Sequence, residues 1–208
     1  MYLEGGLKQY LDDLASSKPA PGGGSAAAAA GALGVAALSM VANFTIGKEK
    51  YKAVEAEMKT LLATAEGCRM KLQRLIDADV VAYGMVSAAY KLPKETDDQK
   101  KIRTKAIQAA LREAMQVPLE TCRILADAMA LCAPLVEKGN TNLASDVAVG
   151  AQLIAAAYDA AFVNVEMNLS GLDDAELKVR LRDELVSKSV KIVQAGKAIG
   201  ERVRKGMK

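Results

Sequence analysis

The chain has 208 residues and a net charge of +3, and 51% of its residues are hydrophobic. This length allows one domain, or at most two small ones, and supplies enough apolar residues for a sizeable core. The small net charge does not by itself indicate a nucleic-acid partner. Because the sequence contains no histidine, Ser-His-Asp and Cys-His mechanisms and histidine-based zinc sites are excluded. Acid–base chemistry must then use carboxylates, Lys, Tyr or Cys.

Composition also narrows the fold class. Aromatic residues make up only 4% of the chain, and Trp is absent. An apolar complement dominated by Ala, Leu, Val and Met suits close-packed helices better than β-sandwiches. Cys68, Cys122 and Cys132 form no CxxC pair, and no signal peptide is recognisable. We therefore expect free thiols in a reducing cytoplasm.

The chain opens with an amphipathic segment, 2–15, that predicts a helix ending before Pro19. A Pro-Gly loop, 19–25, leads into a stretch, 22–47, that contains no charged residue. The apolar stripe of the first segment consists of Leu3, Leu7, Tyr10, Leu11 and Leu14.

The uncharged stretch has two interpretations. It is long enough to cross a bilayer, but Ala and Gly dominate it and polar residues such as Asn43 and Thr45 interrupt it. We favour a buried central helix near a subunit interface, since a helix that is apolar on all sides is otherwise a core helix. Gly31 and Gly34 would let a neighbouring helix approach closely.

The rest of the chain carries the helical period, and no run alternates apolar and polar residues convincingly. Thr96 with Gln99 resembles a capping box, and Pro118 is expected to kink or break the helix that contains it. Asn142 or Ser145 is a candidate N-cap for the helix after the loop at Gly139. The sequence therefore predicts a single-domain, all-α bundle of six to eight helices around a buried Ala/Gly-rich helix. The later helices are expected over 48–90, 96–138, 142–169 and 174–204.

The three consecutive glycines of the Pro-Gly loop, Gly22, Gly23 and Gly24, are the first candidate site. Glycine permits backbone conformations that turn N–H groups towards a ligand, here at the start of a helix. A turn that needs glycine only for steric reasons explains them equally well. The loop is not a phosphate P-loop, because no Gly-Lys-Ser/Thr follows.

Two carboxylates two residues apart, Asp77 and Asp79, form the second candidate site. On a helix they face different sides, and Asp79 shares its side with Tyr83. Asp77 follows Arg74 by three residues, so a surface ion pair explains it. Asp79 lies among Ile76, Val80 and other apolar residues, and partial burial would suit a general acid or base.

Two asparagine-rich stretches complete the set. In 139–146, a loop with an N-cap is the simpler interpretation of Asn140, Asn142 and Asp146. Asn164 and Asn168 lie one helical turn apart on a face that follows an apolar run. Buried amides need partners, which are either another helix or a polar heterocycle with amide-like edges.

Taken in order, these motifs closely resemble the cyclodeaminase/cyclohydrolase family, and the resemblance covers nearly the whole chain. That family comprises the C-terminal domain of formiminotransferase-cyclodeaminase and the stand-alone bacterial methenyltetrahydrofolate cyclohydrolases. The residues that carry the resemblance are Pro19-x-Pro21-Gly22-Gly23-Gly24-Ser25, Gly31-Ala32-Leu33-Gly34, Thr45-x-Gly47-Lys48-x-x-Tyr51, Asp77-x-Asp79, Leu92-Pro93-Lys94, Val117-Pro118-Leu119, Asn140-x-Asn142-x-x-Ser145-Asp146 and Asn164-Val165-x-x-Asn168.

The resemblance implies a cytoplasmic, all-helical homodimer with its folate site near the subunit interface and no nucleic-acid or membrane partner. It implies hydrolysis of 5,10-methenyltetrahydrofolate to 10-formyltetrahydrofolate, which the stand-alone length favours, or release of ammonia from 5-formiminotetrahydrofolate. Neither reaction needs a metal or redox cofactor.

Site roles follow from the resemblance and the chemistry. Asp79 is expected to activate water or move a proton, with Asp77 as the second candidate. The glycine loop and Ser25 would shape the mouth of the pocket, and Lys48 would contact the folate glutamate. Asp146 either joins the site or caps a helix. Pterin edges or water would be held by Asn140, Asn142, Asn164 and Asn168. A non-catalytic folate-binding protein and a helical protein without a small ligand remain as alternatives.

Overall fold

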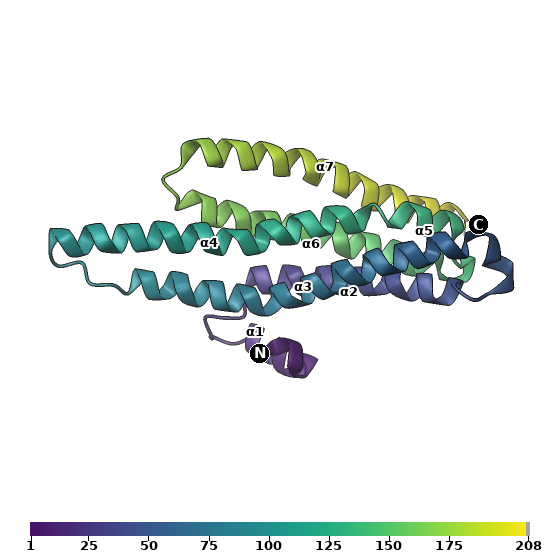
Figure 1. Cartoon of the computed structure of the whole chain (residues 1–208), viewed down its shortest axis with the longest axis horizontal. Coiled ribbons are helices and arrows are strands. Elements are labelled where there is room, and N and C mark those ends of the chain that lie inside the picture. The colour runs from purple at the N-terminus through teal and green to yellow at the C-terminus, as the bar shows by residue number, and fades with distance from the viewer. Residues whose placement is uncertain (207–208) are drawn as a thin grey trace.

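The computed structural model describes residues 1–206 and confirms the all-α prediction. Long helices lie side by side along one axis, and the helices α3 and α4 extend beyond the first residues of α2 at one end (Figure 1). Three short 3-10 helices lie at Tyr2–Glu4, Glu49–Val54 and Thr141–Leu143; the first precedes α1, and the other two lie between longer helices. Within the described residues there are seven α-helices: α1 (Leu7–Leu14), α2 (Gly23–Thr45), α3 (Glu55–Tyr90), α4 (Asp97–Met129), α5 (Cys132–Lys138), α6 (Ala144–Ser170) and α7 (Ala175–Gly206).

Helix α2 forms the centre of the bundle and packs mainly against α3 and α6. Its glycines permit close approach, as the sequence predicts. A Cβ at Gly31 would lie 2.6 Å from Leu125 Cδ2, and one at Gly34 would lie 2.9 Å from the backbone oxygen of Gly150. The fully buried side chains of Val35, Leu38 and other α2 residues join the main core.

One face of α2 is nevertheless exposed, which corrects the expectation of burial on all sides. Leu33 is 60% exposed and Phe44 is 54% exposed, and Met40 lies between them on the same stripe. Both α2 and α6 are long and apolar enough to cross a membrane by length and composition. In this fold about half or more of each apolar stretch is buried inside the bundle, as in core helices.

The N-terminal segment differs from the predicted amphipathic helix. Glycines at positions 5 and 6 divide it into a 3-10 turn and the short helix α1. Tyr10 is buried, but Leu3, Leu7 and Leu11 are exposed. The stripe is therefore not a core stripe: only its tyrosine is buried, and Leu14 is half-buried.

Some of the predicted helix boundaries agree with the structure, and others differ from it. The capping box of Thr96 and Gln99 is present at the start of α4. Pro118 lies inside α4 without ending it, and the break falls at 130–131 instead. At the start of α6 neither Asn142 nor Ser145 caps the helix, because its N-cap residue is Leu143. Cys68, Cys122 and Cys132 are free and buried, as expected.

Candidate functional site

The N-terminus of α2 is enclosed by side chains from three other helices. Gly22 is its N-cap residue in an extended conformation, with no side chain of its own to cap the helix. The first backbone N–H groups of a helix lack intrahelical partners and carry a partial positive charge. They therefore form a donor-rich surface at Gly23, Gly24 and Ser25.

Asp79 reaches this surface from α3. A Cβ at position 24 would overlap Asp79 Oδ1, so only glycine allows the carboxylate to lie this close to the α2 backbone. Partial burial raises the pKa of Asp79 above its ordinary value of 3.8, and a hydrogen bond from the Ser25 backbone opposes part of that rise. A carboxyl group with a raised pKa beside helix N–H donors suits proton transfer and the attraction of a cation.

Asn164 and Asn168 approach the same place from α6. A Cβ at Gly23 would lie 3.4 Å from Asn164 Nδ2, so this amide lies against the glycine turn. Asn164 Nδ2 donates to the backbone oxygen of Ala160 at 2.8 Å, and Asn168 Nδ2 donates to that of Asn164 at 2.9 Å. These bonds fix both amides along α6, with Asn164 directly beside the turn.

Tyr10 is a member of this cluster that the sequence interpretation assigned only to an apolar stripe. Its hydroxyl lies 3.1 Å from Ser25 Oγ, and both side chains are buried. Burial raises the pKa of Tyr10, and the negative charge of Asp79 adds to that rise. A tyrosine in a stripe of leucines was the sequence signal that could have indicated this role, since a buried phenol needs a partner for its hydroxyl.

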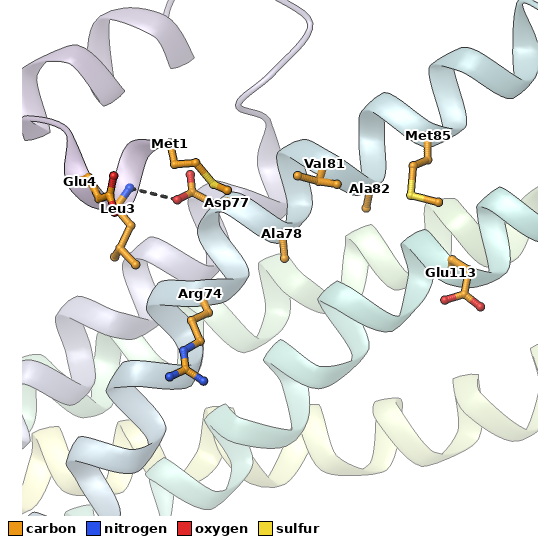
Figure 2. Close-up of a pocket in the computed structure, with 10 residues that line it drawn as sticks. All are labelled: Met1, Leu3, Glu4, Arg74, Asp77, Ala78, Val81, Ala82, Met85 and Glu113. Carbon is orange, nitrogen blue, oxygen red and sulfur yellow. Dashed lines mark hydrogen bonds between the residues drawn. The ribbon is translucent and has the colours of Figure 1, made fainter.

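Asp77 faces away from this cluster and binds the N-terminal segment, defined here as residues 1–21. Its carboxylate accepts hydrogen bonds from the backbone N–H groups of Tyr2, at 2.7 Å, and Leu3, at 3.2 Å. Figure 2 shows the bond from Leu3. Asp77 is buried, so the expectation of a surface ion pair with Arg74 is wrong. The two backbone bonds explain its burial.

The remaining candidates gather at the opposite end of α2. Asn140 donates from Nδ2 to the backbone oxygen of Phe44 at 3.2 Å, and its backbone N–H donates to Thr45 Oγ1 at 2.9 Å. Its Oδ1 accepts from the backbone N–H of Asn142 at 3.1 Å. Asn140 thus closes the C-terminal end of α2. Lys48 is exposed just beyond this end.

Asp146 lies in the first turn of α6, near this second group, where a carboxylate complements the helix dipole. The sequence-predicted residues therefore form two groups rather than one. The glycine-turn group contains Gly22, Gly23, Gly24, Ser25, Asp79, Asn164 and Asn168, and the far-end group contains Lys48, Asn140, Asn142 and Asp146. Since α2 has 23 residues, the groups lie about 33 Å apart in one chain.

Surface hollows lie outside the glycine-turn group. One of about 640 Å³ runs between the N-terminal segment, α3 and α4, and includes Leu3, Asp77, Val81, Met85 and Glu113 (Figure 2). Another of about 500 Å³, beside Tyr2 and Gln9, also includes Asp77. Neither Asp79 nor the glycine turn lines either of these hollows.

Together the fold and the site define a class: an all-helical bundle that holds a half-buried carboxylate against the glycine-rich start of its central helix. Comparison with known proteins makes this specific, since residues 6–187 match the formiminotransferase-cyclodeaminase family. The chain belongs to that family.

The chain is similar to relatives named as cyclohydrolases and to relatives named as cyclodeaminases. A methenyltetrahydrofolate cyclohydrolase from Methylorubrum extorquens is 43% identical over 97% of this chain and 95% of its own length. A formimidoyltransferase-cyclodeaminase from Rattus norvegicus is 32% identical, but the aligned region spans only 34% of that longer protein. The crystal structure of a formiminotetrahydrofolate cyclodeaminase from Thermotoga maritima matches with a TM-score of 0.77 and 34% identity, covering 96% of this chain and 94% of that one.

Proposed function

We propose that this protein is a methenyltetrahydrofolate cyclohydrolase that converts 5,10-methenyltetrahydrofolate and water to 10-formyltetrahydrofolate. The proposal is supported by the Methylorubrum extorquens relative of that name, which aligns over nearly its whole length. The structural observation that carries it is the Asp79 carboxylate, half-buried against Gly24 and the N-terminus of α2. The reaction needs no cofactor and would take place in the cytoplasm.

In the proposed reaction, water adds to the methenyl carbon and gives a proton to Asp79. The N5–C bond then opens, so that one proton of the water ends on N5 and the other is released. The methenyl bridge carries positive charge, which an adjacent carboxylate attracts. A raised pKa brings Asp79 closer to neutral pH, where proton transfer in both directions is most efficient.

The other members of the glycine-turn group have supporting roles in this proposal. The Gly22–Ser25 turn forms one wall beside the carboxylate, and Asn164 presents an amide next to it. Asn168, one turn along α6, is bonded to the Asn164 backbone and extends the polar row. These amides would pair with the amide-like edge of the pterin or orient the water.

Cyclodeaminase activity is the second candidate, favoured by the Thermotoga maritima structure and the Rattus norvegicus relative, whose names state that activity. In this reaction N10 of 5-formiminotetrahydrofolate attacks the formimino carbon, and ammonia leaves. The same carboxylate would take the proton from N10. Both reactions pass through a tetrahedral carbon between nitrogens, so the Asp79 site fits both.

A homodimer is part of the proposal, because it would unite the two groups of site residues. Two copies related by a two-fold axis across the middle of α2 would place the glycine turn of one beside the Asn140 end of its partner. In a two-fold interface both protomers use the same surface, so each contact between the glycine turn and the Asn140 end occurs twice. Two equivalent sites would result, each built from both protomers.

An apolar face on the α2–α6 pair supports this arrangement. The two helices are antiparallel, since Gly34 meets Gly150 while Gly23 meets Asn164. Helical spacing places Leu33, Met40 and Phe44 of α2 on the same side as Val149, Val163 and Met167 of α6, and all six are exposed. A face about 33 Å long and about 18 Å wide offers on the order of 600 Å², which approaches the area of a stable interface.

The direct test offers the purified protein each substrate in turn and measures methenyl absorbance and ammonia in parallel. A cyclohydrolase consumes methenyl absorbance and releases no ammonia, whereas a cyclodeaminase releases ammonia as methenyl absorbance appears. A folate-binding protein would show a thermal shift with folates and no turnover of either substrate. That result, or a protein indifferent to folates, would contradict the proposed enzyme.

A further inference from the structure

The N-terminal segment is bound to the bundle by contacts that the proposed chemistry does not use. Asp77 anchors its first residues through the backbone N–H groups of Tyr2 and Leu3. The ring of Tyr2 packs edge-to-face on Tyr10, with ring centres 5.2 Å apart. Tyr2 also donates from its hydroxyl to Asp13 at 2.8 Å. These contacts hold the ring of Tyr10 in one position against α2.

From that position the Tyr10 hydroxyl reaches the one residue that joins it to the carboxylate. It lies 3.1 Å from Ser25 Oγ, which is completely buried. The Asp79 carboxylate lies against Gly24, the residue before Ser25, and a backbone hydrogen bond from the same Ser25 lowers the pKa of that carboxylate. Ser25 therefore contacts Tyr10 through its side chain and Asp79 through its backbone.

We propose that Tyr10 is a positioning residue of the site, whose hydroxyl holds Ser25 and thereby fixes the N-terminus of α2 against the Asp79 carboxylate. Asp77 supports this arrangement by anchoring the N-terminal segment that carries Tyr10. The kinetic test of this positioning role rests on the proposed function, whereas the hydrogen bonds that link Tyr10, Ser25 and Asp79 do not. In this proposal Tyr10 acts through Ser25 and is assigned no contact with the substrate.

The groups near Asp79 define what the loss of the Tyr10 hydroxyl would change. They are the Ser25 backbone N–H from α2 and Tyr10 from α1, together with the Asn164 amide from α6, which lies beside the adjacent Gly23. Tyr10 is the titratable member of these three neighbours. Replacing its hydroxyl by hydrogen removes a polar group from a buried place and leaves Ser25 Oγ without that partner, which disfavours a neighbouring charge.

The variant Tyr10→Phe tests this with the ring packing preserved. We expect kcat to fall about three- to tenfold with little change in KM, because a loss of this size corresponds to one hydrogen bond. The acid limb of the kcat/KM profile should move to higher pH, because Asp79 becomes harder to ionise. Tyr90→Phe is the matched control: its ring is exposed at the end of α3, and the variant should behave as wild type.

A double-mutant cycle that combines Tyr10→Phe with Ser25→Ala is the second test of the positioning role. If the hydroxyls act through each other, the double variant should lose no more than the more damaging single variant. Fully additive losses in two folded single variants would overturn the proposal. Circular dichroism checks that each variant folds. If Tyr10→Phe does not fold, Ser25→Ala alone tests the loss of the same hydrogen bond.

A readout independent of turnover separates this inference from the proposed function. Carbon NMR of the labelled Asp79 carboxyl, assigned with Asp79→Asn, follows its titration in the folded protein. Tyr10→Phe should move the midpoint to higher pH even if the wild-type protein turns over neither folate. An unchanged midpoint would refute the positioning role, whereas a moved midpoint without wild-type turnover would refute only the enzyme.

Discussion

At the scale of single residues, the start of α2 combines a steric requirement with an electrostatic one. Gly24 leaves room for the Asp79 carboxylate, and Ser25 supplies a backbone donor to it. The carboxylate also satisfies part of the donor-rich helix end, so Asp79 has a structural role beside the proposed catalytic one. Substitutions that separate the two roles are therefore the informative ones.

Substitution of Gly24 tests the steric requirement. In Gly24→Ala the new methyl group would overlap Asp79 Oδ1, so the carboxylate must move away from the helix end. We expect turnover to fall about a hundredfold or more, since displacement of a catalytic group by about 1 Å has that effect. Steady-state kinetics measure it. Gly22→Ala, where a Cβ meets nothing within 4 Å, should retain more activity, and equal losses in both would contradict the account.

The raised pKa of Asp79 also predicts how stability depends on pH. Burial disfavours the ionised form in the folded state, so the folded protein binds more protons than the unfolded chain between the ordinary value of 3.8 and the raised pKa. Stability should therefore fall as pH rises through this window. Relative to Asp79→Asn, the wild type should lose free energy of unfolding over that range. Urea unfolding at several pH values checks this, and a constant difference between the two proteins would refute it.

At the scale of elements, the glycines of α2 set how closely helices approach. Gly34 and Gly150 face each other across the α2–α6 contact. A Cβ at Gly34 would lie 2.9 Å from the backbone oxygen of Gly150, and a Cβ at Gly150 would lie 2.8 Å from that of Gly34. Backbone cannot move aside as the end of a flexible side chain can. The packing of α6 on α2 also places Asn164 beside the glycine turn, so this contact positions the site.

Gly34→Ala should therefore destabilise the fold by about 1–3 kcal/mol, the usual range for overpacking. Gly84→Ala provides the matched control on α3, because its Cβ would meet nothing within 4 Å. There the helix preference of alanine should stabilise the protein by about 0.5–1 kcal/mol. Denaturant unfolding of both variants measures these changes. A Gly34→Ala protein as stable as the wild type would show that the helices can separate without cost.

Helical periodicity predicted the elements well because most long helices here carry a sustained apolar pattern. The uncharged stretch located α2, and the Thr96–Gln99 pair located the start of α4, since both signals are local in the sequence. Pro118, where a kink or a break was expected, does not end α4, because packing of a largely buried helix face outweighed one missing N–H donor. Periodicity also joined the 3-10 turn at Tyr2–Glu4 to α1, although two glycines lie between them.

The site was predictable only in part, for a similar reason. The pairing of the glycine turn with Asp79 and Asn164 follows motifs that the sequence displays. The contact of Tyr10 with Ser25 depends on how the N-terminal segment folds back over α3, which no local pattern specifies. The separation of Asn140 from Asp79 likewise required knowing that they occupy opposite ends of α2.

At the scale of the whole molecule, a single chain holds two groups of candidate site residues, which the proposed dimer would join as half-sites, and an apolar face between them. The exposed apolar residues of α2 and α6 form a patch at the upper end of the range that a monomer usually presents. In the proposed dimer this patch is buried and the half-sites meet. The proposal thus explains the exposed stripe and the divided site with one arrangement.

Charge on the apolar face should separate the protomers. Leu33→Glu with Phe44→Glu would place two carboxylates in the proposed interface, and burial of unpaired charge is strongly unfavourable. We expect a monomer by sedimentation velocity and turnover reduced to background. Val179→Glu, at an exposed position on α7, should remain dimeric. A double variant that stays dimeric would show that copies associate through another face.

Mixing two inactive variants tests whether protomers share a site. Asp79→Asn damages one half-site, and Lys48→Ala with Asn142→Ala damages the other. When the two proteins are unfolded and refolded together, half of the dimers are mixed and each has one intact site, so activity should recover to about a quarter of wild type. No recovery from two folded, dimeric variants would mean that each site lies within one chain.

Turnover of 5,10-methenyltetrahydrofolate by Asp79→Asn, compared with wild type, tests the central claim most directly. Asparagine keeps an oxygen that can accept from the Ser25 backbone, so the variant should fold and remain dimeric. We predict that its rate of methenyl loss falls by about 10²–10⁴, the contribution of a general acid or base. A folded Asp79→Asn dimer with a near-normal rate would contradict the assignment of this carboxylate to the chemistry.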